Sequence, residues 1–172
     1  MFGLRGKGIA HALGVCELVD IRLVTFGKAY GAHGAIVLCN EDYRTYLLNF
    51  ARSFIYTTAL PEASFIHALN AVEFSEIDGQ RRKLQENLQF FRSKLDQREF
   101  RSEWNSPIQI LSVDTVDDLR ILEERLTSKG IAVKAIYPPT VMIGNECLRI
   151  CIHAENTKKE LNKLIECIDA IK

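Results

Sequence analysis

Residues 21–39 read IRLVTFGKAYGAHGAIVLC, two β-branched runs that flank a glycine-rich segment. Ile21–Thr25 and Ala35–Cys39 have the composition of short strands, and the glycines between them allow a tight connection. Lys28 lies in that connection, between Gly27 and Gly31. Because glycines let a ligand approach the backbone, the segment predicts two strands that present a lysine at a candidate site.

The amine of Lys28 is the first candidate for chemistry. A lysine reacts with a carbonyl group when it is partly desolvated or lies near other cations, so that the neutral amine is available. Thr25 stands three residues earlier, at the end of the first strand. The alternative is an ordinary surface lysine in a glycine turn, which is the commoner situation for this residue type. The spacing alone leaves both interpretations open.

Two helices are predicted downstream of the second strand. Asn40 is a good N-cap, and apolar residues follow at 43, 46, 47, 50, 51 and 54. Pro61 predicts the start of a long second helix, whose later part keeps an apolar stripe of Leu84, Leu88, Phe91 and Leu95. A long helix of this kind, apolar first and charged later, is expected to bridge two domains.

The remainder of the chain predicts a small α/β domain. Strands are expected at 108–113, 131–136 and 147–153, and helices at 116–129 and 157–171. Their order is β-α-β-β-α, which suits a compact two-layer unit.

Arg149 is the second candidate, because it lies in the strand at 147–153 between apolar neighbours. Its own face carries Cys147 and Cys151. A guanidinium buried there needs an anion, which is either a carboxylate of the protein or the carboxylate of a ligand. The residues alone do not decide between the two.

Other polar side chains give weaker signals. Thr57 and Thr58 are able to donate to a phosphate, although a turn that ends a helix explains threonines equally well. Three histidines stand apart in the sequence and are expected to be surface or satisfied core residues: His33, His67 and His153.

Composition excludes several classes of partner. The 22 basic residues balance the 22 acidic ones, so no overall field recruits nucleic acid or an acidic membrane surface. Five cysteines without a CxxC pair indicate reduced thiols in a cytosol and no metal site. The chain has no signal-peptide pattern and no apolar run near the roughly 20 residues of a membrane span. We therefore expect a cytoplasmic protein without metal, nucleic-acid or membrane partners.

Three motifs in order resemble the α-oxoamine synthases, a fold-type I family that depends on pyridoxal 5'-phosphate. TFGKAYGAHG at 25–34 is similar to that family's cofactor-lysine motif. YTTALP at 56–61 is similar to its tyrosine-serine/threonine-threonine segment. PPTV at 138–141, followed by LRI at 148–150, is similar to its substrate-carboxylate region. The resemblance covers essentially the whole chain.

The resemblance implies a fold and a division of the chain. Residues 1–74 would form the C-terminal part of the cofactor-binding large domain, and 75–106 a linking helix and connection. Residues 107–172 would form the small C-terminal α/β domain. The family's aspartate for the pyridine nitrogen, and its histidines beside the cofactor, would lie before residue 1. We therefore expect the chain by itself to be catalytically inactive.

The resemblance also implies a role for each candidate residue. Lys28 would hold pyridoxal 5'-phosphate and later remove the Cα proton of the amino acid, and Thr25 would hydrogen-bond near the phosphate. Thr57 and Thr58 would reach the cofactor phosphate of a neighbouring subunit, in a homodimer with shared sites. Arg149 would bind the carboxylate of the amino acid.

Within the family, the sequences of residues 24–39 and 47–61 are most similar to those of members that condense L-alanine with pimeloyl-CoA in biotin synthesis, with loss of carbon dioxide. Members that acetylate glycine or palmitoylate serine are the alternatives, and a non-catalytic α/β interaction module is the rival from another class. Tyr137 stands where several relatives place a basic residue, which leaves open how the distal end of an acyl group is recognised.

Overall fold

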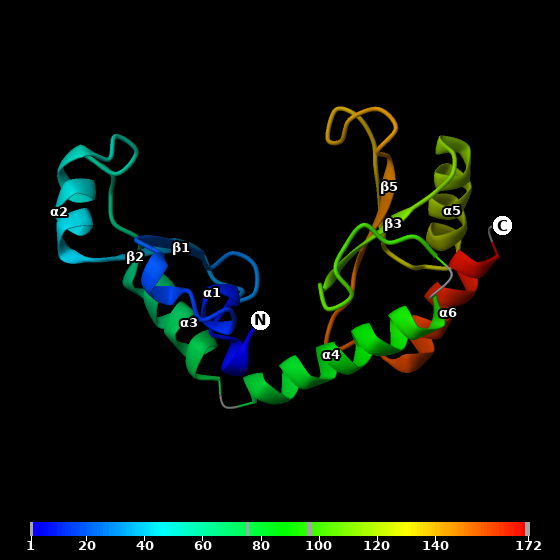
Figure 1. Ribbon diagram of the computed structural model, residues 1–172, viewed down its shortest axis with the longest axis horizontal. Helices are drawn as coiled ribbons and strands as arrows, with labels where there is room; N and C mark the ends of the chain where they lie inside the picture. Colours follow the sequence, from blue (N-terminus) through cyan, green and yellow to red (C-terminus); the bar gives the residue numbers. More distant parts are fainter. Residues whose placement is uncertain (1, 75, 96–97, 171–172) are drawn as a thin grey trace. The chain divides into compact units, whose positions relative to one another are not determined.

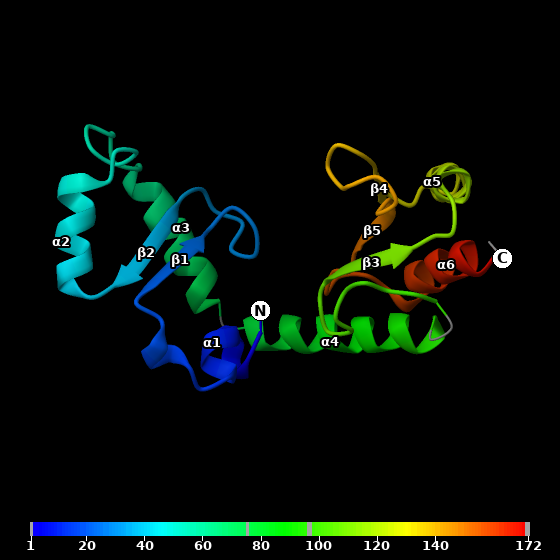
Figure 2. The ribbon, with the colours of Figure 1, turned by 45° about the horizontal axis from the view of Figure 1, so that its top comes forward.

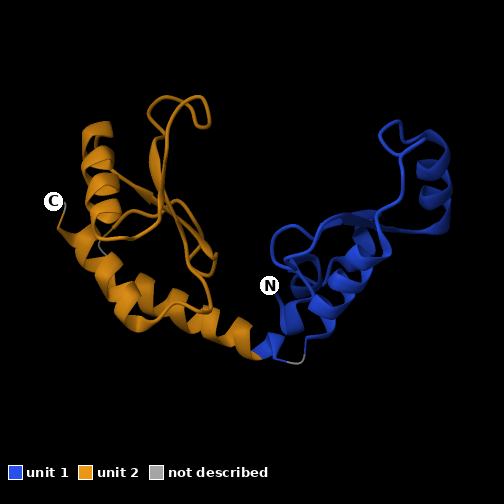
Figure 3. Ribbon diagram, turned by 180° about the vertical axis from the view of Figure 1, so that it is seen from behind, with its two compact units in different colours: residues 1–78 blue, residues 79–172 orange. Residues whose placement is uncertain are grey.

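The computed structural model describes residues 2–74, 76–95 and 98–170. The chain divides into two compact units, Met1–Asp78 and Gly79–Lys172, shown in different colours in Figure 3. Each unit has its own sheet: two strands in the first and three in the second.

A β-hairpin forms the centre of the first unit. Strand β1 (Ile21–Thr25) pairs antiparallel with β2 (Ala35–Cys39), with Ile21 opposite Cys39 and Thr25 opposite Ala35. Three short helical segments precede it: η1 (Leu4–Gly6), α1 (Ile9–Ala12) and η2 (Cys16–Leu18). Helices α2 (Glu41–Phe50) and α3 (Glu62–Glu73) follow it (Figure 1). Both predicted strands are confirmed.

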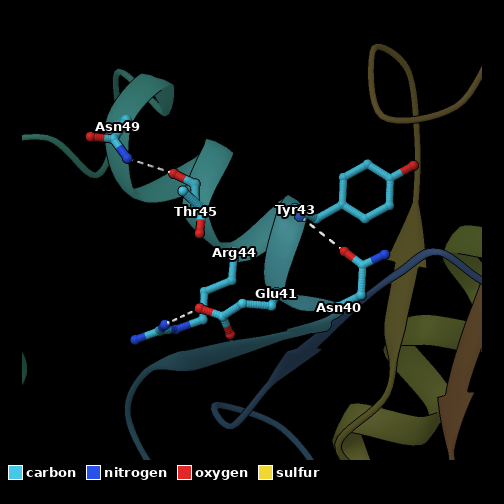
Figure 4. A network of polar contacts seen from close by, with 6 residues as sticks. All are labelled: Asn40, Glu41, Tyr43, Arg44, Thr45 and Asn49. Carbon is cyan, nitrogen blue, oxygen red and sulfur yellow. Dashed lines mark hydrogen bonds and ion pairs between the residues drawn. The ribbon is translucent and has the colours of Figure 1, made fainter.

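The start of α2 shows the predicted cap. The Asn40 side chain accepts a hydrogen bond from the amide of Tyr43 at 2.9 Å, which satisfies a backbone donor of the first turn (Figure 4). Arg44 and Glu41 pair on the exposed surface at 2.7 Å. The predicted start of this helix is confirmed, whereas its end at Phe50 comes before positions 51 and 54 of the predicted apolar pattern.

The second unit has an antiparallel sheet covered by helices. The strand order is β3 (Ile108–Ser112), β5 (Cys147–Cys151), β4 (Lys134–Ile136), with β5 in the centre. Helices α4 (Ile77–Lys94), α5 (Val116–Ser128) and α6 (Lys158–Asp169) surround this sheet (Figure 2). Their buried side chains form one hydrophobic core with those of the strands. The predicted stripe of α4 lies in that core: Leu84, Leu88, Phe91 and Leu95 are all buried.

Polar bonds fix α4 against the segment after β5. The amide of Asn87 is nearly buried and donates to the carbonyl of His153 at 3.0 Å and of Asn156 at 2.9 Å. The Lys158 amine donates to the side-chain oxygen of Asn87 at 3.2 Å. Because a buried amide must be satisfied, these bonds set the position of the strand end on the helix.

Three expectations need correction. The single long helix after Pro61 is wrong: α3 ends at Glu73 and α4 begins at Ile77, because Phe74, with ψ of 115°, leaves the helical region. The predicted strand at 131–136 is shorter, since only Lys134–Ile136 pairs with β5. The predicted strand at 147–153 ends at Cys151. Residue 75 of the predicted long helix and residue 171 of the predicted last helix lie outside the described residues.

Candidate functional site

The connection between β1 and β2 holds Lys28 on a backbone fixed by hydrogen bonds. The amide of Phe26 donates to Gly34 at 2.8 Å, and the amide of Ala32 donates to Phe26 at 3.0 Å. The carbonyl of Lys28 accepts from the amide of Gly31 at 3.1 Å. Phe26 and Ala32 are buried, so the base of the loop is anchored by packing as well.

Gly34 permits a close contact at the end of this loop. It has φ of +113°, and a Cβ built on it would come within 2.5 Å of Leu60 Cδ1. The backbone conformation favours glycine, and a side chain here would also force the end of the Leu60 side chain to shift. Backbone conformation and the contact with Leu60 together explain why a glycine occupies position 34.

The side chain of Lys28 itself lies exposed on the loop. It has no hydrogen bond or ion pair with the described residues, and Thr25 is also exposed, three residues away at the end of β1. An amine without a carboxylate partner fits covalent attachment to an aldehyde. The Thr25 hydroxyl is able to donate a hydrogen bond to a phosphate oxygen.

Thr57 and Thr58 lie after α2, in the turn before α3, and both are exposed. The Thr57 hydroxyl donates to the carbonyl of Ser53 at 3.0 Å, so part of its hydrogen-bonding capacity is used in the turn. The preceding Tyr56 has φ of +62° and a fully exposed side chain. A positive φ at a tyrosine is uncommon and marks this turn as locally strained.

Arg149 lies in the central strand of the second sheet, and its side chain is exposed. The expectation that its guanidinium is buried is therefore wrong, because its face of the sheet is the one opposite the helices. Leu148 and Ile150, on the other face, are buried in the core. The guanidinium of Arg149 has no hydrogen bond or ion pair with any described residue, so the protein-carboxylate alternative gains no support.

The two cysteines expected on the face of Arg149 differ in exposure. Cys147 is buried, and that burial raises the pKa of its thiol, whereas Cys151 is exposed. All five cysteines of the chain are free. Among the described residues, no group of three or more His, Cys, Asp or Glu could hold a metal ion.

Tyr137 points away from the face that carries Arg149. Its hydroxyl is buried among groups of α5, and burial is the main cause of its raised pKa, with Glu123 adding to the rise. Its ring packs against the core of the second unit. This position therefore does not present a polar group beside Arg149.

Lys134 is the polar residue that the sequence reasoning missed. It lies in β4 directly opposite Arg149, and it is exposed. The sequence contained a signal for it, since Lys134 is the one polar residue between Val133 and Ala135 in an otherwise apolar run, and neighbouring strand residues face opposite sides of a sheet.

The candidate residues fall in both units. Lys28, Thr25, Thr57 and Thr58 belong to the first, and Arg149 to the second. Their assembly into one site stays a prediction.

The histidines His33, His67 and His153 are all exposed. No helix in the described part of the chain has the length and apolarity needed to cross a membrane.

Comparison with known proteins gives a family match over nearly the whole chain. The model for aminotransferases of class I and II matches residues 4–168. The chain is 38% identical to the 8-amino-7-oxononanoate synthase of Emericella nidulans, over 98% of this chain and 43% of that protein. It is also 38% identical to the enzyme of the same name from Buchnera aphidicola, over 96% of this chain and 43% of that protein. The chain thus spans less than half of the length of these relatives.

Solved structures agree with the fold. The structure of 8-amino-7-oxononanoate synthase from Francisella tularensis superposes with a TM-score of 0.82 at 30% identity, over 98% of this chain and 50% of that one. The serine palmitoyltransferase of Sphingomonas wittichii superposes with a TM-score of 0.87 at 22% identity, over 99% of this chain and 44% of that one. The predicted fold class, α/β of the fold-type I pyridoxal-phosphate transferases, is confirmed.

Proposed function

Because this chain belongs to the aminotransferase class I and II family, we propose that it forms the C-terminal part of a C-acyltransferase dependent on pyridoxal 5'-phosphate. The reaction is the condensation of L-alanine with pimeloyl-CoA, with loss of carbon dioxide, as in biotin synthesis. The observation that carries the proposal is Lys28, an exposed amine without a carboxylate partner among the described residues, on a loop whose backbone is fixed. The names of the relatives support the choice of substrates.

The proposed division of the chain follows the family. Residues 1–74 belong to the cofactor-binding domain, 75–106 connect, and 107–172 form the small domain. The cofactor, when bound, supplies an electron sink for the bond broken at the amino acid Cα, while the protein supplies orientation and charge.

The chain's own residues would bind the cofactor and the amino acid and would move a proton. The amine of Lys28 would hold the cofactor at its aldehyde carbon and, once released from it, would take the proton from the Cα of the amino acid. The hydroxyl of Thr25 donates to the phosphate. Arg149 binds the carboxylate of the amino acid through its planar fork of donors, a geometry that matches two carboxylate oxygens.

Thr57 and Thr58 are proposed to act across a subunit interface. In a homodimer with shared sites, their hydroxyls donate to the cofactor phosphate held by the partner subunit. Apolar side chains near them are strongly exposed in the isolated chain, with Phe50 at 65% and Phe54 at 55%. Exposed apolar area of this kind favours association with a further protein surface. The same observation supports the rival interpretation, a non-catalytic interaction module.

A chimera tests the proposed activity. The C-terminal segment of the Emericella nidulans relative is replaced by residues 1–172, and turnover is measured with alanine, glycine and serine against pimeloyl-, acetyl- and palmitoyl-CoA. We expect turnover of alanine with pimeloyl-CoA, lost in Lys28→Ala and kept in the control Lys7→Ala, another exposed lysine of the first unit. Preference for glycine with acetyl-CoA, or serine with palmitoyl-CoA, would replace the proposed substrates. Activity that survives Lys28→Ala contradicts the role of this amine.

A further inference from the structure

Lys134 and Arg149 place two like charges side by side on the open face of the second sheet. The register of β4 and β5 sets them directly opposite each other, and Ala135, the next residue of β4, is buried on the helix-covered face. Side chains of directly opposed residues lie about 5 Å apart at Cβ, and like charges in such a pair are destabilising. An anion bound between the two side chains would offset this repulsion.

The neighbouring positions of this face offer no carboxylate. Ile110 lies opposite Arg149 on its other side, in β3. The adjoining rows of the face are formed by Ser112, Cys147 and Ile136 on one side and by Ile108 and Cys151 on the other. Every one of these side chains is neutral or apolar, so none balances the two charges.

No described residue from another element supplies the missing anion. Neither the amine of Lys134 nor the guanidinium of Arg149 has a hydrogen bond or ion pair with a described residue. The nearest element packed on β4 is α5, whose Glu123 accepts a hydrogen bond from the amide of Ala135 at 3.1 Å. By contrast, Arg92 donates to Gln109 at 2.8 Å and Arg101 to Ser112 at 3.0 Å, so other arginines of this unit are satisfied internally.

We propose that Lys134 and Arg149 form one two-cation site that binds a carboxylate jointly. Arg149 supplies a planar fork and Lys134 a compact charge beside it, a combination that suits a carboxylate whose two oxygens face different cations. Lys134 is then a second residue, beside Arg149, that binds the acid substrate directly. The identification of that carboxylate with the amino acid's own rests on the proposed function; the existence of the site does not.

The test is a titration of the 172-residue chain followed by NMR. The ligand is N-acetyl-L-alanine, which presents a carboxylate without a cationic amine, and the control ligand is N-acetyl-L-alaninamide. The amide signals of Lys134 and Arg149 report binding, and those of Ala135 and Leu148 report that the sheet remains folded. We expect shifts with the acid, none with the amide, and weaker binding as salt is added.

Variants separate the pair from general surface charge. Lys134→Gln is expected to weaken binding about fivefold, the scale of one exposed ion pair, and Lys134→Arg to restore it. The control Lys159→Gln removes one charge from an exposed position of α6 and should leave affinity unchanged. The proposal is overturned if Lys134→Gln binds as Lys159→Gln does, if the amide binds as well as the acid, or if the acid does not bind.

The two proposals fail separately. An inactive chimera together with carboxylate binding at the pair would remove the proposed activity and leave the anion site. An active chimera with unchanged affinity in Lys134→Gln would do the reverse.

Discussion

The backbone carbonyl of Lys28 accepts a hydrogen bond from the amide of Gly31, with 3.1 Å between nitrogen and oxygen. This bond closes a turn that begins at the lysine. The base of the surrounding loop is held by two further hydrogen bonds, from the amide of Phe26 to Gly34 and from the amide of Ala32 to Phe26. The main chain at Lys28 is therefore fixed while its side chain stays exposed. Such an arrangement presents an amine in a defined place without using it in the fold.

Gly34→Ala should loosen this loop. The substitution adds a Cβ in a left-handed conformation and drives it into Leu60, so we expect the loop to lose about 2 kcal/mol of local stability. Amide hydrogen exchange at Phe26, which donates to Gly34, measures the change. Gly31→Ala is the matched control, since its φ is +61° but nothing lies within 4 Å of its added Cβ. Equal protection of Phe26 in the two variants would show that the Leu60 contact contributes nothing.

Asn87→Ala should destabilise the second unit by about 2 kcal/mol, because it removes the buried amide that donates to the carbonyls of His153 and Asn156. Urea unfolding followed by the fluorescence of Trp104, the one tryptophan of the sequence, measures the loss. Gln89→Ala, at an exposed position of the same helix, should change stability little. A midpoint for Asn87→Ala as high as that of the Gln89 control would contradict the role of these bonds.

Glu160 should give the second unit a stability that falls in acid. Its carboxylate accepts hydrogen bonds from the amide of Thr157 at 2.8 Å and from its hydroxyl at 3.0 Å, which lowers its pKa below the ordinary 4.5. A lowered pKa contributes stability above the unfolded-state value, and that contribution is lost as pH falls through the folded-state value.

The corresponding measurement compares unfolding free energies at about pH 7 and about pH 3, on either side of the ordinary glutamate pKa. Glu160→Gln should lose less stability on acidification than the unmodified chain does. Glu155→Gln, at an exposed position before the helix, serves as the control. The same acid sensitivity in all three proteins would show that the capping carboxylate does not contribute.

The strands and helix caps were readable from the sequence because their signals are local. β1, β2 and the Asn40 cap depend on residue types within a few positions, and the structure has them as expected. The break at Phe74 was missed because the apolar pattern continues on both sides, and only backbone conformation reveals it.

The candidate site was predictable only where one residue carries the signal. Lys28 stood out because glycines surround it, and the structure leaves its side chain exposed without a partner among the described residues. The exposure of Arg149 and its pairing with Lys134 depend on strand register, which joins residues 15 positions apart in sequence. Periodicity gives the face of each strand but not which residues of two strands meet, so this pair needed the structure.

The most direct measurement of the central claim is reductive trapping of the cofactor on the 172-residue chain. The protein is incubated with pyridoxal 5'-phosphate, reduced with borohydride and digested, and the modified peptide is identified by mass spectrometry. The account predicts that the modification lies on the peptide containing Lys28, that it disappears in Lys28→Ala, and that Lys7→Ala leaves it unchanged. Modification spread evenly over the exposed lysines, or unchanged in Lys28→Ala, would contradict it.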